Sequence, residues 1–104
     1  MARIPAKLGL SRLNPGVSSA NAWHRTPRAP RFAASNPATG RPLAEVTGAT
    51  PRDYEELMGA TWDAFLAWRD LPAPRRGEAV RRIGAALRAN KDALGTLVSL
   101  GAGK

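Results

Sequence analysis

Residues 50–69 read TPRDYEELMGATWDAFLAWR and contain a complete set of helix signals. Thr50 stands as the N-cap, Pro51 takes the first helical position, and Asp53 follows where the free amides of a helix start favour a carboxylate. Apolar residues then recur at helical spacing. The sequence predicts a helix over residues 51–69 with one apolar face, made of Tyr54, Met58, Thr61, Phe65 and Trp68 and widened by Leu57 and Trp62.

Two further helices are predicted after a break at residues 71–74 (LPAP), because two prolines so close together cannot lie inside a helix. The second helix is expected from about Pro74, with a buried stripe of Val80, Ile83 and Leu87. Asn90 is predicted to end it and to cap a third helix, from Lys91 to about Leu100, which Gly101 ends. The other side of the second helix is interpreted as a solvated face, carrying Arg75, Arg81, Arg82 and Arg88.

Toward the N-terminus the helical signals disappear. Residues 1–30 predict an irregular, disordered N-terminal arm, with at most a helical turn around residues 7–13, because prolines interrupt every apolar stretch. Residues 31–35 and 42–46 predict a β-hairpin whose turn spans Asn36 to Gly40. Pro42 cannot donate a ladder hydrogen bond, so the pair is expected to be an edge hairpin. The fold expected for the chain is mainly α with one β-hairpin.

Composition narrows the functional classes. The net charge is +8, but residues 1–44 hold seven basic and no acidic groups, while residues 45–104 hold nine basic and eight acidic ones. The folded part is therefore nearly neutral, and nucleic-acid binding is not the favoured interpretation. A small basic binding protein, whose arm attaches to nucleic acid or an anionic membrane, stays as the alternative. Absence of cysteine excludes a disulfide framework and a thiolate nucleophile within these 104 residues.

Localisation and candidate sites follow from the same residues. No apolar run is long enough to cross a bilayer or to form a secretory signal core, so a cytoplasmic protein is expected, with an organellar matrix protein carrying a basic transit arm as the minor alternative. His24 has no second ligand or orienting partner nearby in sequence, and residues 101–104 (GAGK) lack the glycine and serine or threonine of a phosphate loop. The carboxylates of residues 53–70 are explained by the helix dipole and solvent exposure rather than by acid–base catalysis. The aromatic residues of the same helix are explained by core packing rather than by base stacking. No catalytic, cofactor-binding or metal-binding residue is predicted.

A set of short motifs occurs in one order along residues 31–104. These are residues 35–40 (SNPATG), 43–46 (LAEV), 64–65 (AF), 68–69 (WR), 82–83 (RI), 87–88 (LR) and 103–104 (GK). In this order and spacing the chain resembles the front of NAD-dependent aldehyde dehydrogenases. Residues 71–78 (LPAPRRGE) and 91–100 (KDALGTLVSL) are most similar to the antiquitin branch, the α-aminoadipic semialdehyde (piperideine-6-carboxylate) dehydrogenases of lysine breakdown.

The resemblance implies an α/β enzyme with a Rossmann-type NAD domain, a cysteine nucleophile and a homo-oligomeric assembly. Residues 31–104 would form an incomplete N-terminal part of such an enzyme, whose hairpin and helices pack on the cofactor domain. We expect this fragment alone to be inactive and to bind no NAD. Association with a full-length homologue is a further expectation, since its uncovered helix faces match a surface that such a homologue contains. The family usually has glutamate where this chain has Gly101. That departure fits a truncated or frameshifted reading frame, an incomplete gene model or a relic.

Overall fold

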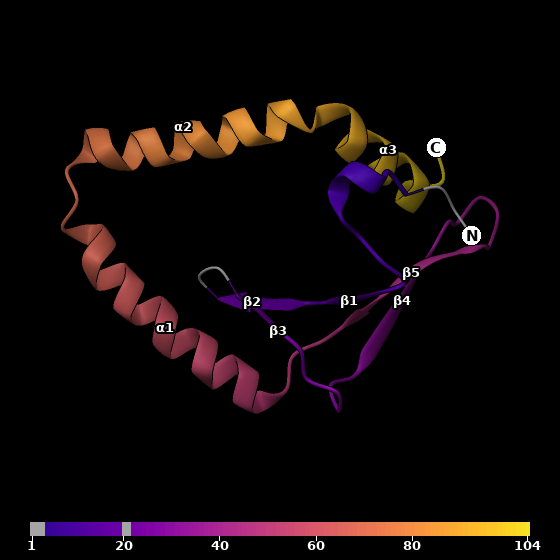
Figure 1. Ribbon diagram of the computed structural model, residues 1–104, viewed down its shortest axis with the longest axis horizontal. Coiled ribbons are helices and arrows are strands. Elements are labelled where there is room, and N and C mark those ends of the chain that lie inside the picture. Colours follow the sequence, from indigo (N-terminus) through magenta and orange to yellow (C-terminus); the bar gives the residue numbers. More distant parts are fainter. Residues whose placement is uncertain (1–3, 20–21) are drawn as a thin grey trace.

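The computed structural model describes residues 4–19 and 22–104, in which two small β-sheets are followed by three helices (Figure 1). The chain is therefore mixed α/β, with more strand than the single expected hairpin. A 3₁₀ turn, η1 (Ala6–Leu8), comes first. The strands are β1 (Leu13–Pro15), β2 (Val17–Ser19), β3 (Ala22–His24), β4 (Arg31–Ser35) and β5 (Pro42–Thr47), and the helices are α1 (Pro51–Arg69), α2 (Ala73–Ala89) and α3 (Lys91–Ala102).

Helix α1 has the bounds that the sequence predicts, and a capping box starts it. The amide of Asp53 donates to Oγ1 of Thr50 at 3.2 Å, and the amide of Thr50 donates to Oδ2 of Asp53 at 3.0 Å. Each residue thus satisfies a backbone donor that the first helical turn cannot satisfy internally. The helix start predicted from Thr50, Pro51 and Asp53 is confirmed.

Helices α2 and α3 follow the predicted break, with two corrections at their ends. Asn90 was expected to cap α3, but its side-chain amide donates to the carbonyl of Ala86 at 2.8 Å and so binds the last turn of α2. Helix α3 continues through Gly101, which was expected to end it. It ends instead at Gly103, whose φ of 73° places the residue in the left-handed region that favours glycine.

The hairpin of β4 and β5 is confirmed, but its position in the sheet is not. Asn36 starts the turn by accepting the amide of Ala38 at 2.9 Å, and Gly40 takes a φ of 71°. An edge hairpin was expected because of Pro42. Strand β5 is instead the centre of a three-stranded sheet, with order β1-β5-β4. Proline is tolerated there because Pro42 is the first residue of the strand.

The arm predicted to be irregular contains η1 and three short strands in its described part. Strand β1 pairs in parallel with β5, with Leu13 opposite Glu45, and β2 pairs antiparallel with β3. The prolines of residues 1–30 interrupt the apolar periodicity of this segment, but they do not prevent β1 from pairing with β5, which lies far away along the chain. Gly16, which follows β1, allows the chain to pass close to the end of β5, since a Cβ there would overlap the carbonyl oxygen of Thr47.

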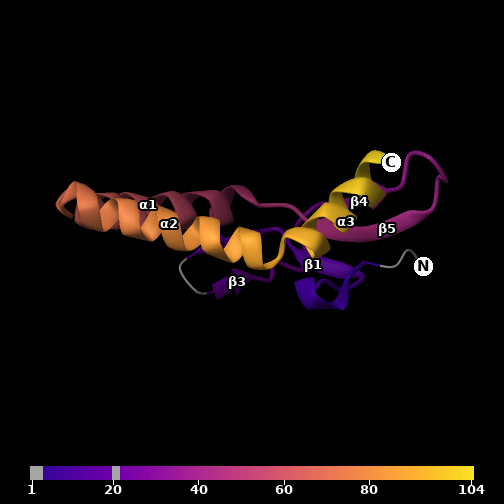
Figure 2. The same cartoon turned by 90° about the horizontal axis from the view of Figure 1, so that it is seen from above.

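These elements form an open, flat frame (Figures 1 and 2). Helices α1 and α2 diverge from the short linker between them, and α3 returns beside η1 and the tip of the β4–β5 hairpin. Nζ of Lys7 donates to the carbonyl of Ala89 at 2.7 Å, which ties η1 to the end of α2. The radius of gyration is 16.7 Å, whereas a compact domain of this length measures about 13 Å.

The core is correspondingly small. Among the described residues, the apolar side chains that are buried are Val17, Ala29 and Leu43, all in the strand region. The chain exposes 8303 Å² of surface, against about 5,700 Å² for a compact monomer of 11.1 kDa. The three helices therefore contribute little to a core of their own.

Candidate functional site

The apolar side of α1 is the most distinctive surface of the described chain. Trp62 and Tyr54 expose 60% and 56% of their surface, although both side chains have large apolar area to bury. The rings of Trp62 and Phe65 have centroids 5.4 Å apart, and the guanidinium of Arg69 lies 5.8 Å from the Phe65 centroid. The predicted apolar stripe therefore exists, but it faces outward.

The stripe of α2 is also uncovered. Val80, Ile83 and Leu87 were expected to be buried, yet they expose 61%, 62% and 57% of their surface. Near the end of α2, Lys7 and Leu8 from the η1 region and Leu94 from α3 border an open groove with Ile83 and Leu87. The stripe was expected to be buried against the family's cofactor domain; within the described residues it stays exposed, because α2 diverges from α1 (Figure 1).

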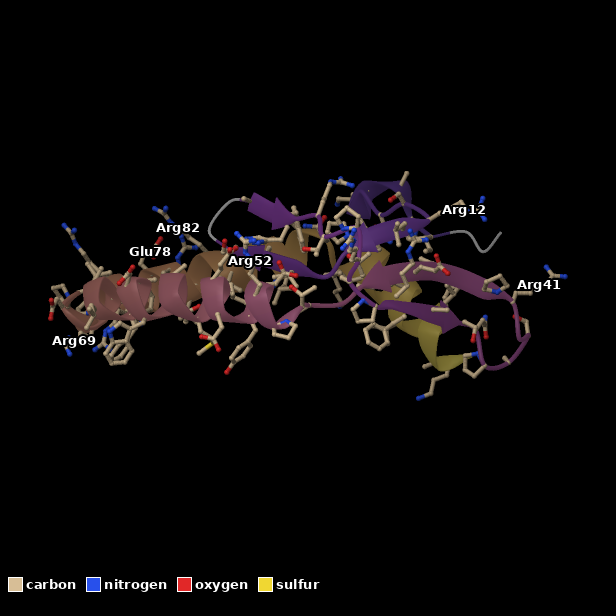
Figure 3. The ribbon with its side chains drawn as sticks, turned by 90° about the horizontal axis from the view of Figure 1, so that it is seen from below. Arg12, Arg41, Arg52, Arg69, Glu78 and Arg82 are labelled. Atoms are coloured by element: carbon tan, nitrogen blue, oxygen red, sulfur yellow. The ribbon has the colours of Figure 1, made fainter. Side chains whose placement is uncertain are left out.

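Both stripes face away from one charged side of the molecule. Figure 3 places Arg52, Glu78 and Arg82 together on this charged side. Helical periodicity sets Arg52 opposite the α1 stripe, and Glu78 and Arg82 opposite the α2 stripe. We name the shared surface the apolar face; its members are Tyr54, Met58, Trp62, Phe65 and Trp68 on α1 and Val80, Ile83 and Leu87 on α2.

The opposite side is charged and exposed, as the arginines of α2 predict. Glu78 accepts from Arg81 at 2.7 Å and from Arg82 at 3.2 Å, and Arg52 pairs with Glu56 at 3.0 Å. The hydrogen bonds from Arg81 and then Arg82 lower the pKa of Glu78 below its usual value. Such exposed pairs stabilise a helix weakly, so their main effect is to keep this side in water.

One carboxylate departs from the expected exposure. Asp53 is buried, and the hydroxyl of Thr26 donates to its two carboxylate oxygens, which lie 3.0 and 2.9 Å away. The backbone amide of Thr50 is the largest cause of a lowered Asp53 pKa; burial opposes it, and Thr26 adds to it. Asp53 thus fastens the segment after β3 to the start of α1. Sequence periodicity could not reveal this role, because Thr26 lies far away along the chain and in no helical pattern.

The other residues considered from sequence take structural positions. Nε2 of His24 lies 2.9 Å from Oγ of Ser19 across the β2–β3 pair. Residues 101–104 lie at the C-terminus of α3, where the helix dipole disfavours a phosphate. Over residues 4–19 and 22–104, no three His, Cys, Asp or Glu side chains gather closely enough to hold a metal ion. Nor does a helix in that part of the chain have the length and apolar character needed to cross a membrane.

Comparison with known proteins gives this surface its context. The sequence model of the aldehyde dehydrogenase family matches residues 23–104. The chain belongs to the aldehyde dehydrogenase family. The hairpin, its turn and all three helices of the described structure lie within the matched range. The predicted family is therefore confirmed.

Several relatives at 43–52% identity come from one branch of this family. Aldehyde dehydrogenase family 7 member A1 of Pisum sativum is 45% identical over 98 residues, covering 94% of this chain and 19% of that protein. The alpha-aminoadipic semialdehyde dehydrogenase of Rattus norvegicus is 52% identical, over 65% of this chain and 13% of that protein. The enzyme of the same name from Bos taurus is 43% identical, over 94% of this chain and 18% of that protein. The predicted similarity to the antiquitin branch is confirmed. The chain spans less than a fifth of the length of the curated relatives it matches.

Proposed function

We propose that the chain supplies the N-terminal packing element of an NAD-dependent aldehyde dehydrogenase, whose complete form oxidises a semialdehyde of lysine catabolism to the acid. Two relatives are named alpha-aminoadipic semialdehyde dehydrogenase, and these names support the proposed substrate class. The observation that carries the proposal is the apolar face. Aromatic and aliphatic side chains arranged on one side of two helices are suited to lie against a larger protein body.

The 104 residues alone are proposed to be inactive. The family resemblance implies a cysteine nucleophile, and the sequence has no cysteine. NAD also fits poorly here. The amides at the start of α1, the helix that follows β5, are already used by Thr50 and Asp53. A pyrophosphate at that helix start would meet the Asp53 carboxylate, so we derive no step through the cofactor.

A full-length homologue is the proposed partner of the apolar face, and the parent enzyme is proposed to be a homo-oligomer. The test is co-expression of the 104-residue chain with a full-length antiquitin-type dehydrogenase, followed by affinity purification through a tag on the chain. We expect the dehydrogenase to be recovered with the wild-type chain and lost with Trp62→Glu. The control Asp63→Lys, on the charged side of α1, should leave recovery unchanged. Equal recovery with all three chains would exclude this surface.

Activity is measured separately. The purified chain is incubated with α-aminoadipic semialdehyde and NAD, and reduced cofactor is followed by absorbance. We expect no turnover above buffer. Turnover by the chain alone would overturn the proposal, because it would require a nucleophile other than cysteine.

The alternative of a basic arm for nucleic acid or membranes is not retained. The described part of residues 1–30 is folded, and β1 is held in the sheet by β5, with Asn14 donating to the carbonyl of Glu45 at 3.3 Å. A cytoplasmic location remains our proposal. It is tested by microscopy of the chain carrying a C-terminal fluorescent tag, and an organellar signal would contradict it.

A further inference from the structure

We propose that Lys7 is a positioning residue that sets the bend between α2 and α3, so that the N-terminal arm fixes the direction of α3. Without the Lys7 side chain, α2 and α3 are expected to join into one helix over residues 73–102. The contacts behind this inference all join two described residues of the chain. The inference concerns the fold, and it does not rest on the function proposed above.

The apolar pattern of this segment does not itself require a bend. Ile83 and Leu87 lie four residues apart, and the spacing continues by three, four and three residues through Asn90 and Leu94 to Leu97. A pattern that keeps its phase in this way is typical of one uninterrupted helix. Asparagine disfavours a helix interior much less than glycine or proline does, so Asn90 alone does not account for the break.

Two side chains take the places of backbone donors at the bend. In an uninterrupted helix the carbonyls of Ala86 and Ala89 would accept from the amides of residues 90 and 93. The side-chain amide of Asn90 instead donates to the carbonyl of Ala86 at 2.8 Å. Nζ of Lys7 donates to the carbonyl of Ala89 at 2.7 Å. A side chain inserted into the ladder of helix hydrogen bonds is a known cause of a sharp kink.

The arm meets both helices at this point. The ammonium group of Lys7 lies at the C-terminal end of α2, where the helix dipole and the last carbonyls favour a cation. Leu8, the next residue, borders one groove with Leu87 of α2 and Leu94 of α3, and η1 lies beside α3. Lys7 and Leu8 therefore stabilise the bend together, one by charge and one by apolar contact.

The arm can hold a bend because it is itself fixed to the sheet. The amide of Glu45 donates to the carbonyl of Arg12 at 2.7 Å. Asn14 closes a turn with Ser11, since its side chain accepts from the Ser11 amide at 2.9 Å and donates to the Ser11 carbonyl at 2.8 Å. An exposed lysine on a freely moving segment would lose much conformational entropy on forming one hydrogen bond. Here the backbone around it is already ordered.

The bend places the end of α3 beside the β4–β5 hairpin. Figure 1 shows α3 turning from the line of α2 toward η1 and the hairpin tip. At its end, Gly103 lies so close to the turn that a Cβ would be 2.9 Å from the amide nitrogen of Ala38. A straight continuation of α2 would carry Gly103 away from this turn.

The test is the distance between α2 and α3 in the full 104-residue chain, measured by pulsed electron paramagnetic resonance. The sequence has no cysteine, so Arg75→Cys and Val98→Cys place two spin labels at exposed positions. In an uninterrupted helix these positions lie about 35 Å apart, since each residue rises about 1.5 Å. The bent chain should give a shorter distance.

Three variants carry the same pair of labels. Lys7→Met should favour the straight form over the bent form by about tenfold, because a hydrogen bond from a charged donor is lost. Lys7→Arg keeps a charged donor and should restore the short distance. The control Lys91→Met removes another exposed lysine beside the bend and should leave the distance unchanged.

Hydrogen exchange at the Ala93 amide distinguishes straightening from unfolding. In the bent form this amide belongs to the first turn of α3, where a helix supplies no partner. In the straight form it donates to the carbonyl of Ala89. Exchange at Ala93 should therefore become slower in Lys7→Met, whereas loss of helix would not protect this amide.

Four results would overturn the inference. These are a distance of about 35 Å in the wild-type chain, an unchanged distance in Lys7→Met, an equal lengthening in Lys91→Met, or no return of the short distance in Lys7→Arg. Circular dichroism shows whether each variant keeps its helices. If Lys7→Met loses helicity, Asn90→Ala is added to it, because alanine favours the helix. A short distance in that double variant would also overturn the inference.

Discussion

Replacing Gly16 with alanine should open the three-stranded sheet. Gly16 lies between β1 and β2, where the chain crosses the end of β5. A Cβ at this position would overlap the carbonyl oxygen of Thr47 and lie 2.9 Å from Cγ1 of Val46. The side chain of Val46 can turn away, but the carbonyl belongs to the backbone of β5. The strain can therefore be relieved only by moving β1 away from β5.

The magnitude follows from overpacking. Forcing a methyl group against fixed backbone costs about 1–3 kcal/mol. The β1–β5 pairing is a short parallel ladder, from Leu13 opposite Glu45 to Pro15 opposite Thr47, and each of its hydrogen bonds contributes only about 0.5–1.5 kcal/mol. The substitution thus costs about as much as this ladder provides. We expect β1 to detach while the β4–β5 hairpin and the helices persist.

Hydrogen exchange at one amide measures this directly. The amide of Glu45 donates to the carbonyl of Arg12 at 2.7 Å, at the start of the β1 contact. A loss of 1–3 kcal/mol corresponds to exchange about 5- to 150-fold faster at this amide. Gly84→Ala is the matched control. Nothing lies within 4 Å of a Cβ there, and alanine should strengthen α2 by up to about 1 kcal/mol. Unchanged protection of Glu45 in Gly16→Ala, or none in the wild-type chain, would refute the reasoning.

Three other outcomes are expected. Gly103→Ala should destabilise the end of α3 by about 1–2 kcal/mol, because Gly103 has a φ of 73° and an added Cβ would lie 2.9 Å from the amide nitrogen of Ala38. The measurement is hydrogen exchange of the Lys104 amide, which donates to the carbonyl of Ser99 and should exchange faster in the variant. The Asp53 pKa is lowered from 3.8, so the stability that its carboxylate adds is present above about pH 4 and is lost as pH falls through the folded-state value. The urea midpoints of wild type and Asp53→Asn should therefore differ at pH 7 and converge toward pH 2, and a constant difference would contradict this. The chain alone should melt broadly by circular dichroism, because so few of its described apolar side chains are buried; a sharp cooperative transition would contradict this.

The helices were the most predictable part of the fold, because their signals are local. Thr50, Pro51 and Asp53 specify a helix start within four residues, and apolar spacing extends it to Arg69. The two errors at helix ends arose because the sequence offers more than one residue or role that suits a helix end. Asn90 had two acceptable roles, and its side chain bonds back to Ala86. Gly101 and Gly103 both suit a helix end, and only contact with the hairpin turn at residues 37–38 distinguishes them.

The N-terminal strands were missed because their partners are distant in sequence. Residues 13–15 (LNP) have no alternation to read, and they become a strand only because β5 offers a second edge. The burial of Asp53 was missed for the same reason, since it depends on the hydroxyl of Thr26. Hydrophobic spacing predicted which sides of α1 and α2 are apolar. The family resemblance predicted that these sides pack on a cofactor domain outside residues 31–104, and in the described structure both sides are exposed.

The strand region and the helices are therefore stabilised in different ways. The strand region holds itself together through backbone pairing, the close crossing at Gly16 and the link from Thr26 to Asp53, with only a few buried apolar side chains. The helices hold their own backbone hydrogen bonds but leave their apolar side chains in water, at a cost of about 1.5–3 kcal/mol for each large side chain that stays uncovered. Capping boxes and surface ion pairs contribute too little to offset several such side chains. Folding of α1 and α2 into one rigid arrangement is thus coupled to whatever covers the apolar face, so binding at that face and stability of the helices should rise and fall together.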